Sequence, residues 1–493
     1  MDGAIPSSGG CHGGRDVMAE AARAAGKSAV LDRLAADYPQ GPHDQPQSMC
    51  PAFGSLRVGL RMRRTATILC GSACCVYGLT FTSHFYGARR SVGYVPFNSE
   101  TLVKGQLFED IRDAVYQVAK PAELDAVVVI NLCVPTASGV PLDRLPKQID
   151  GVRVIGVDVP GFGVPTHAEA KDVLAAAMLR FARQEAEQGP VARPRQATLL
   201  PTVALIGELF PADPPGVGAL LAPMGLAVAP PLPSREWRDL YGALDCAAAA
   251  AVHPFYTASV REFRAAGRPV VGSGPVGVDG TAAWLDAVGH VTGVSADAAK
   301  ARALPAIRAA LDANPVKARI TVSGYEGSEL LVARLLIEAG AEVPYVGTAC
   351  PRTEWSEADR DWLEARGAYV QYRASLEQDM AAMREARPDL AVGTTPLVQA
   401  AKELGIPALY FTNMVSARPL FGAAGAASVA GIVAAQTRGA PRFARMVSFF
   451  QGVGAGETAG YGGTGRPQEP AGARERFRKA RAARAKAAEA VGS

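Results

Sequence analysis

The chain has 493 residues, of which 48% are hydrophobic and 20% charged, and this composition excludes a disordered or collagen-like chain. At about 150 residues per domain, the length predicts about three domains. The formal net charge is +4, but residues 474–489 alone contain seven Lys or Arg against two Glu. Because the remainder is nearly neutral, we expect no nucleic-acid-binding surface on the folded body.

The N-terminal region lacks the basic start and the apolar stretch of a secretory signal, so we expect a cytoplasmic protein. Residues 1–45, rich in Gly, Ser, Pro and Ala, predict a mobile extension. Gly, Pro, Ser or Thr interrupt the long uncharged runs at 65–88, 214–234 and 419–437. We therefore expect no membrane-spanning segment.

From residue 125 onward, short β-branched runs alternate with Ala/Leu/Glu/Arg stretches of helical spacing. This alternation is typical of βα units, and continuous apolarity within a run indicates a strand buried on both faces. The pattern predicts an α/β fold with mainly parallel sheets. The expected strands begin near Asp125, Val152, Thr202, Arg268, Ala318, Glu342, Asp389 and Pro407.

Two polar, linker-like stretches, QEAEQGPVARPRQ before Ala197 and LDANPVKAR before Ile320, interrupt this alternation. They predict a first α/β domain over residues 46–188, a second over 194–314 and a third over 315–463. Residues 464–493 are Ala/Arg-rich and follow a Gly-rich stretch, which predicts a flexible basic tail.

Cysteines carry the main functional signal, and in a cytoplasmic chain of this size they do not indicate a disulfide framework. Cys50, Cys75 and Cys133 occupy settings typical of loops at element ends, where three thiolates could hold a soft metal centre. The alternative is that each is a small buried hydrophobe. The spacings of 25 and 58 residues match neither a zinc ribbon nor a ferredoxin run, so spacing leaves both possibilities open.

An ordered set of motifs extends this signal: CPAFGSLR from Cys50, CGSACCVYGLTF from Cys70, NSETLVKGQLFEDI from Asn98, VINLCVPT from Val129 and DVPGFGVP from Asp158. Together they resemble the catalytic subunits of nitrogenase-like reductases, over most of the chain from about residue 46. The resemblance implies three Rossmann-like domains in an arrangement similar to nitrogenase component 1.

The resemblance also implies that Cys50, Cys75 and Cys133 ligate the irons of a [4Fe-4S] cluster, with the fourth ligand from a partner subunit. Family spacing selects Cys75 over its neighbour Cys74. If the backbone there is extended, the two side chains point to opposite sides, so one of them reaches the metal. Among the others, Cys70 is expected in a core, Cys11 in the extension, and Cys246 and Cys350 in structural positions.

No motif for molybdenum-cofactor ligands can be placed, which favours a tetrapyrrole substrate. The resemblance implies reduction of the ring-B C7=C8 double bond of chlorophyllide a, in bacteriochlorophyll biosynthesis. The implied partners are a sister catalytic subunit (Z type) in a heterotetramer and a separate ATP-dependent iron–sulfur electron donor (X type) that uses ATP-Mg. The alternatives are a subunit of a related protochlorophyllide reductase, a non-catalytic cofactor scaffold, or a metal-free NAD-linked oxidoreductase.

Two glycine motifs bear on nucleotide binding. Gly272, Gly274 and Gly277 form a G-x-G-x-x-G after an expected strand, but Pro275 removes a backbone donor from the loop. The stretch AARAAGKS has Ala21 where a phosphate-binding loop has its first glycine, and no strand precedes it. We therefore assign nucleotide hydrolysis, where the reaction needs it, to another protein.

The stretch from Asn98 predicts an amphipathic helix with Ser99 or Thr101 as N-cap and an apolar stripe through Leu107, Ile111 and Val115. In the family, this segment lies near the cluster on the side of the electron donor. We assign no catalytic role to a histidine of the folded body. The candidate pocket-wall residues for the macrocycle are Tyr86, Phe97 and Phe162.

Overall fold

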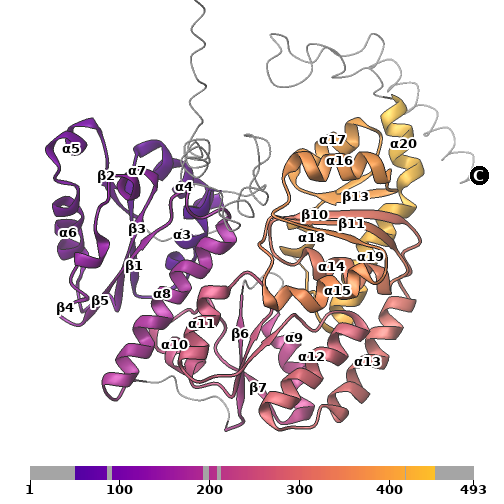
Figure 1. Cartoon of the computed structure of the whole chain (residues 1–493), viewed down its shortest axis with the longest axis horizontal. Coiled ribbons are helices and arrows are strands. Elements are labelled where there is room, and N and C mark those ends of the chain that lie inside the picture. The colour runs from indigo at the N-terminus through magenta and orange to yellow at the C-terminus, as the bar shows by residue number, and fades with distance from the viewer. Residues whose placement is uncertain (1–49, 86–91, 193–198, 208–212, 417, 450–493) are drawn as a thin grey trace, which may run out of the picture.

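The computed structural model describes residues 50–85, 92–192, 199–207, 213–416 and 418–449, which form three β-sheets covered by helices (Figure 1). Every strand pairing is parallel except that of β4 with β5. The α/β class with mainly parallel sheets is therefore confirmed. The expected extension at 1–45 and the tail at 464–493 lie outside the described residues.

The first sheet has the strand order β2-β1-β3-β5-β4. Its strands are β1 (Thr65–Gly71), β2 (Val92–Pro96), β3 (Ala126–Asn131), β4 (Gln148–Ile149) and β5 (Val152–Asp158). Its helices are α3 (Pro51–Arg61), α4 (Ala73–Phe85), α5 (Ser99–Lys104), α6 (Leu107–Val118), α7 (Cys133–Ala137) and α8 (His167–Gln188).

The second sheet has the order β7-β6-β8-β9. Its strands are β6 (Thr202–Ile206), β7 (Ala227–Val228), β8 (Ala248–Ala251) and β9 (Val270–Gly272). Its helices are α9 (Pro214–Leu221), α10 (Trp237–Leu244), α11 (Thr257–Ala265), α12 (Gly277–Thr292) and α13 (Asp297–Asp312).

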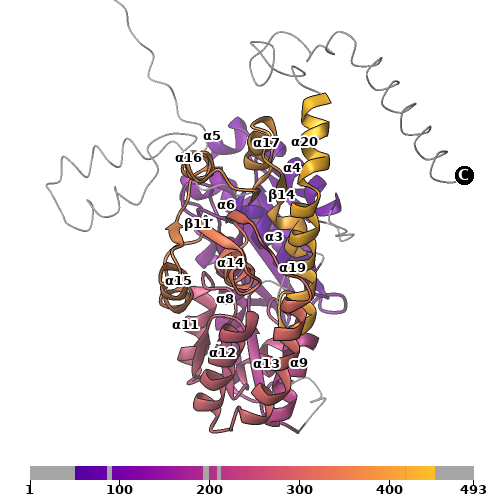
Figure 2. The same ribbon diagram turned by 90° about the vertical axis from the view of Figure 1, so that its right-hand side faces the viewer.

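The third sheet has the order β12-β11-β10-β13-β14. Its strands are β10 (Arg319–Gly324), β11 (Glu342–Thr348), β12 (Tyr369–Tyr372), β13 (Leu390–Gly393) and β14 (Ala408–Tyr410). Its helices are α14 (Glu329–Glu338), α15 (Glu357–Glu364), α16 (Leu376–Ala386), α17 (Thr395–Glu403), α18 (Phe411–Ser416), α19 (Gly422–Arg438) and α20 (Ala440–Phe449), and α20 projects beyond the sheet (Figure 2).

All eight expected strands are present, as β3, β5, β6, β9, β10, β11, β13 and β14. The three sheets fall one within each expected domain range, while the boundaries themselves stay a prediction. Sequence reasoning did not place the described strands β1, β2, β4, β7, β8 and β12. In β8 the reason is its four alanines, because alanine favours helices over strands. In β8 all four alanines are buried between two neighbouring strands, where small side chains allow helices to pack closely.

The stretch from Asn98 to Val118, expected as one amphipathic helix, forms two helices, α5 and α6. The apolar stripe of Leu107, Ile111 and Val115 is confirmed, since all three are buried on α6. The expected N-cap is wrong: Asn98 caps α5, and its side chain accepts a hydrogen bond from Thr101 N (2.9 Å). Among the described residues, no helix combines the length and apolarity that a bilayer-spanning segment needs.

Helix α8 joins the first sheet to the second. It packs against α3 on one side and against α10 and α11 on the other, within one continuous apolar core. The buried Asp172 carboxylate accepts hydrogen bonds from the backbone N–H groups of Ala258 (2.7 Å) and Ser259 (2.8 Å). A side chain of α8 therefore satisfies two N–H groups at the start of α11, groups that a helix leaves unpaired.

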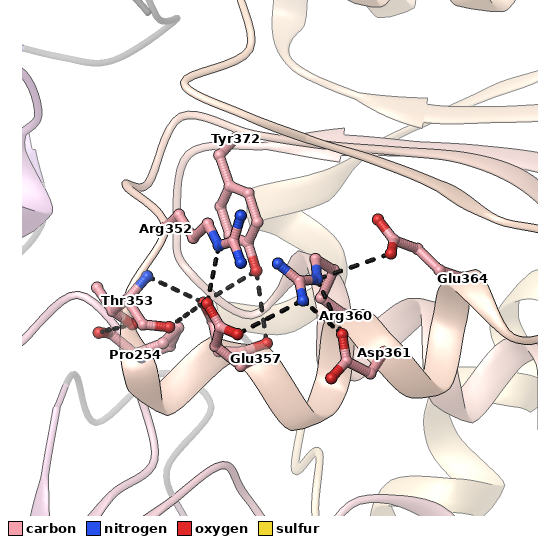
Figure 3. Close-up of polar contacts among 9 residues, drawn as sticks. Pro254, Arg352, Thr353, Glu357, Arg360, Asp361, Glu364 and Tyr372 are labelled. Atoms are coloured by element: carbon pink, nitrogen blue, oxygen red, sulfur yellow. Dashed lines mark hydrogen bonds and ion pairs between the residues drawn. The ribbon is translucent and has the colours of Figure 1, made fainter. Parts of the chain in front are cut away.

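Polar contacts join the third sheet to the other two. Figure 3 shows Thr353, after β11, whose hydroxyl donates to the carbonyl of Pro254, between β8 and α11 (2.8 Å). Beside it, within the third unit, Arg352 pairs with Glu357 (2.8 Å). The guanidinium of Arg373 binds both carboxylate oxygens of Glu169 on α8, at 2.6 and 2.7 Å. Bidentate Arg–carboxylate pairs fix orientation as well as distance, so this pair ties α8 to the third sheet.

The glycine motif at 272–277 has the strand–turn–helix form of a dinucleotide site, but side chains fill it. A Cβ on Gly272 would lie 2.8 Å from Trp355, and one on Gly274 would lie 2.8 Å from Phe421. The Glu338 carboxylate accepts from Val278 N (2.5 Å) and Asp279 N (3.2 Å) at the start of α12. A carboxylate thus occupies the anion-binding position that a pyrophosphate would need.

We predict that Asp172→Ala will lower the free energy of unfolding by about 2 kcal/mol, because it leaves two backbone N–H groups without their acceptor. Urea unfolding of the purified chain, followed by circular dichroism, measures the effect as a lower midpoint. Glu385→Ala, which removes an exposed carboxylate on α16, is the control and should leave the midpoint nearly unchanged. Equal midpoints for both variants would contradict the assignment.

Candidate metal centre

Two of the three candidate ligands lie at the carboxyl edge of the first sheet. Strand β1 pairs with β3 in parallel, with Cys70 opposite Asn131, so the two strands end side by side. Ser72 follows β1, and α4 begins at once with Cys74 and Cys75 in its first turn. Leu132 follows β3, and Cys133 is the first residue of α7.

Cys50 reaches the same edge from outside the sheet. It is the N-cap residue of α3, with Pro51 in the first helical turn, a position that suits proline because its missing N–H has no helical partner. Helix α3 packs against both α4 and α8. The three candidates therefore stand at the starts of three helices, as the sequence indicated for loops at element ends.

Each of the three sulfur atoms has a hydrogen-bond donor. The N–H of Gly161, in the loop after β5, donates to Cys133 Sγ (3.2 Å), and the Ser72 hydroxyl donates to Cys75 Sγ (3.3 Å). The backbone N–H groups of Ala52 and Phe53 lower the pKa of Cys50. Hydrogen bonds of this kind to cysteine sulfur tune iron–sulfur centres.

The three thiols also act on one another electrostatically. Desolvation raises the pKa of Cys50 above its ordinary value, and negative charge on Cys133 and Cys75 raises it further. Desolvation also raises the pKa of Cys75, to which charge on Cys74 and Cys133 contributes. Three thiolates in this place repel one another, so a bound cation is needed to keep all of them deprotonated.

The structure corrects the expected backbone at Cys74 and Cys75. Both lie in the first turn of α4, not in extended backbone, so their side chains diverge by about 100° around the helix. Hydrogen bonds with Ser72 and Cys75 lower the pKa of the exposed Cys74 thiol. Charge on Cys133 acts on both Cys50 and Cys75, which groups these three.

The donors at this edge are soft sulfur atoms, the ligands that iron–sulfur clusters use. Within the ranges that the structure describes, no three His, Cys, Asp or Glu side chains converge closely enough to hold one metal ion. In an iron–sulfur cluster, each thiolate binds a different iron, so the sulfur atoms stand further apart. Three soft, hydrogen-bonded sulfurs that share one edge of a sheet fit such a group.

The remaining cysteines in the described chain behave as core residues. Cys70, Cys246 and Cys350 are at most 1% exposed, and burial raises the pKa of each. The sequence-based placement of Cys70 in a core is therefore confirmed, as is the structural setting of Cys246 and Cys350. Cys11 lies outside the described residues.

The expected pocket walls receive different positions. Phe97 is buried in the core beside Cys70, so it lines no open pocket, whereas Phe162 is 51% exposed in the loop that carries Gly161. Tyr86 lies outside the described residues. A cavity of about 810 Å³ lies at the opposite end of β1, away from the cysteines, and its lining includes Arg63, Arg64, Trp237 and Tyr241.

Sequence reasoning missed Ser72 and Gly161 as partners of the thiols. Both stand in motifs quoted above: Ser72 directly follows β1, and Gly161 lies in the loop after β5. Small or hydroxyl residues in such loops are a signal for donors to the ligands. What the sequence did not show was which sulfur each would reach.

Comparison with known proteins agrees with the fold. Residues 50–437 match the family model "Nitrogenase component 1 type Oxidoreductase". The chain is 67% identical over 459 residues to the "Chlorophyllide reductase 52.5 kDa chain" of Cereibacter sphaeroides, covering 92% of this chain and 91% of that relative. It is 66% identical to the protein of the same description from Rhodobacter capsulatus, covering 92% of each.

Among solved structures, the fold is similar to "Nitrogenase Cp1 at pH 6.5", with a TM-score of 0.66 and 17% identity over 81% of this chain and 94% of that one. A second structure, "Nitrogenase Cp1 at pH 5", gives a TM-score of 0.63 over 83% and 92% of the two chains. The chain belongs to the nitrogenase component 1 type oxidoreductase family.

We predict that Cys74 reacts first with iodoacetamide in metal-free protein near neutral pH, because its thiol is exposed and its pKa is lowered. Cys70, Cys246 and Cys350 should stay unmodified until the chain unfolds. Peptide mass spectrometry over a time course measures each rate. Modification of these three at the rate of Cys74 would show that their burial is wrong.

Proposed function

We propose that this chain is a catalytic subunit of a chlorophyllide reductase. The proposal is supported by the two relatives named chlorophyllide reductase chains, to which the chain is similar over nearly its whole length. The observation that carries the chemistry is the group of three thiols, each with a hydrogen-bond donor and each at a helix start. The reaction proposed is reduction of the C7=C8 double bond of chlorophyllide a.

In this proposal, Cys50, Cys75 and Cys133 bind three irons of a [4Fe-4S] cluster, which when bound supplies low-potential electrons one at a time. The chain's own residues hold the thiolates and reduce their mutual repulsion. Gly161 N–H and the Ser72 hydroxyl donate to two of the sulfurs. A cube with one protein ligand per iron needs a fourth, and we assign it to the sister (Z type) subunit, so that the cluster lies at a subunit interface.

The electron donor in the proposal is a separate ATP-dependent iron–sulfur protein (X type). Helix α5 supports a docking role because it has no buried residue and exposes Val103 (87%) and Leu102 (43%) to solvent. Exposed apolar side chains on a short helix near the cysteine edge suit a transient protein contact. The donor would hydrolyse ATP-Mg, and this chain would supply the thiolates for the receiving cluster.

The test combines iron analysis with turnover. The chain expressed alone should hold little iron and sulfide, and anaerobic co-expression with its sister subunit should restore a full cluster, because three ligands leave one iron unbound. The assembled complex, with donor protein and ATP, should convert chlorophyllide a to the C7=C8-reduced product, followed by absorption spectroscopy. If the complex converts protochlorophyllide but not chlorophyllide a, the chain is a subunit of the related reductase. If it converts neither pigment, the result indicates a non-catalytic scaffold.

We predict that Cys75→Ala removes or severely depletes the cluster, whereas Cys74→Ala retains it. The reason is that negative charge on Cys133 raises the pKa of both Cys50 and Cys75, which indicates that these three thiols lie near one another. Iron content and the electron paramagnetic resonance signal of co-expressed complexes measure the difference. Equal iron loss in the two variants would refute the choice of Cys75.

A further inference from the structure

A buried group of carboxylates lies where α8 meets the third sheet. Residues 325–328 form the loop between β10 and α14. The chain leaves β10 toward β11 and β12 on one side of the sheet and returns to β13 and β14 on the other. Ligands of doubly wound sheets bind outside the carboxyl ends of the strands at such a switch point.

Glu326 is the central member of this group. Its side chain is 10% exposed and has one carboxylate oxygen 3.9 Å from Nε2 of the buried His167, the first residue of α8. The other oxygen accepts a hydrogen bond from the hydroxyl of Thr412 on α18 (3.0 Å). Thr412 is half-buried, so the group extends from the core toward the surface.

Glu329 lies behind Glu326 and is fully buried. Its carboxylate accepts from the N–H groups of Glu326 (2.8 Å) and Gly327 (3.0 Å) and from the hydroxyl of Thr348 (2.9 Å). Burial raises its pKa to about 7, and negative charge on Glu326 contributes to the rise. Two carboxyl groups in one buried site cannot both ionise cheaply, so below neutral pH one of them retains a proton.

Other titratable groups extend the set. Burial also raises the pKa of Asp379, to about 7, with a contribution from charge on Glu329. The Tyr325 hydroxyl bonds that of Tyr410 (2.8 Å), and burial raises the pKa of Tyr325. The ionisable groups that face the pair are therefore His167, Tyr325, Tyr410, Cys350 and Asp379, with Tyr345 bonded to Asp379 (2.9 Å).

The group is connected to the cysteine edge through α3. The ring of His167 lies 6.4 Å from that of Phe53, three residues after Cys50, and 5.5 Å from that of Tyr325. A Cβ on Gly54 would lie 1.7 Å from the carbonyl oxygen of His167, so α3 and α8 touch at this point. The carboxylates thus lie across α8 from the helix that carries a proposed cluster ligand.

We propose that Glu326, supported by His167 and Glu329, holds and passes a proton for the reduction. The inference rests on the proposed function, in which saturating one C=C bond takes two electrons from the iron–sulfur centre and two protons. The O–H bond of Glu326 breaks, its proton moves toward the substrate carbon, and Glu326 is left as a carboxylate. Glu329 then returns a proton to Glu326, which passes it on as the second proton of the reduction, and solvent reprotonates the two carboxylates.

The experiment uses the assembled complex with donor and ATP. In Glu326→Gln, which keeps the shape but cannot release a proton, product formation should fall about 100-fold, the lower range for proton-transfer groups. Reduction of the cluster by the donor should persist, so its reduced signal should accumulate. Glu326→Asp should recover part of the rate with a shifted pH profile. Glu354→Gln, on an exposed carboxylate, is the control and should match the parent.

The proposal also predicts the direction in which turnover changes with pH. Parent turnover should fall as pH rises through about 7, because the pair then loses its stored proton. Infrared titration should show protonated-carboxyl absorption that fades over the same range and loses intensity in Glu326→Gln and Glu329→Gln, while the contribution of Asp379 remains. A Gln variant with parental turnover and pH profile, or a band unchanged in both variants, overturns the proposal. If the parent does not reduce chlorophyllide a but the band behaves as expected, the proposed function fails and the proton-holding pair remains.

Discussion

The parallel pairing of β1 with β3 is the constraint on which the cysteine edge depends. It sets Cys70 opposite Asn131, so that the two strands end together and the following helices start together. A shift of one residue in this register would exchange the two faces on which the β3 side chains pack and would move Cys133 relative to Cys75. The residues of β3 are all buried, which fixes this strand at the centre of its sheet. The position of β3 in turn fixes where Cys133 lies relative to Cys75.

Three neighbouring thiols are unfavourable to ionise together unless a cation is bound to them. Each ionised thiol raises the pKa of its neighbours, and desolvation acts in the same direction on Cys50 and Cys75. The N–H and hydroxyl donors offset part of that cost without removing it. Binding of positively charged iron would release this repulsion, so the stability of the edge and the occupancy of the site are linked. Cys70, buried nearby in an apolar core, has no such coupling, which distinguishes a structural thiol from a candidate ligand.

From residue 125 onward, the sequence predicted eight strands, because apolar runs ended by Gly or Pro identify buried parallel strands directly. It did not place β1, β2 or β12, although these also contain β-branched residues. It did not predict β8, whose alanines carry strand structure only through tertiary burial. It placed Cys50, Cys75 and Cys133 at element ends but assigned extended backbone where α4 begins. It also did not indicate the contact between Glu326 and His167, because no periodicity or spacing in the sequence links two polar residues that lie far apart in the chain. Local periodicity thus predicted elements, while contacts between elements needed the fold.

The position of α8 between two sheets has a consequence for the order of synthesis. Its inner face packs against α10 and α11, and Asp172 meets α11, yet both of these helices leave the ribosome after α8. When the first sheet leaves the ribosome, the apolar face of α8 is therefore still exposed to solvent. Helix α3 packs against α8. Cys50, at the start of α3, is therefore tied both to the first sheet and to a helix that is covered only when α10 and α11 have been made. The metal site that we propose at this edge would therefore be completed only after the second sheet has begun to form.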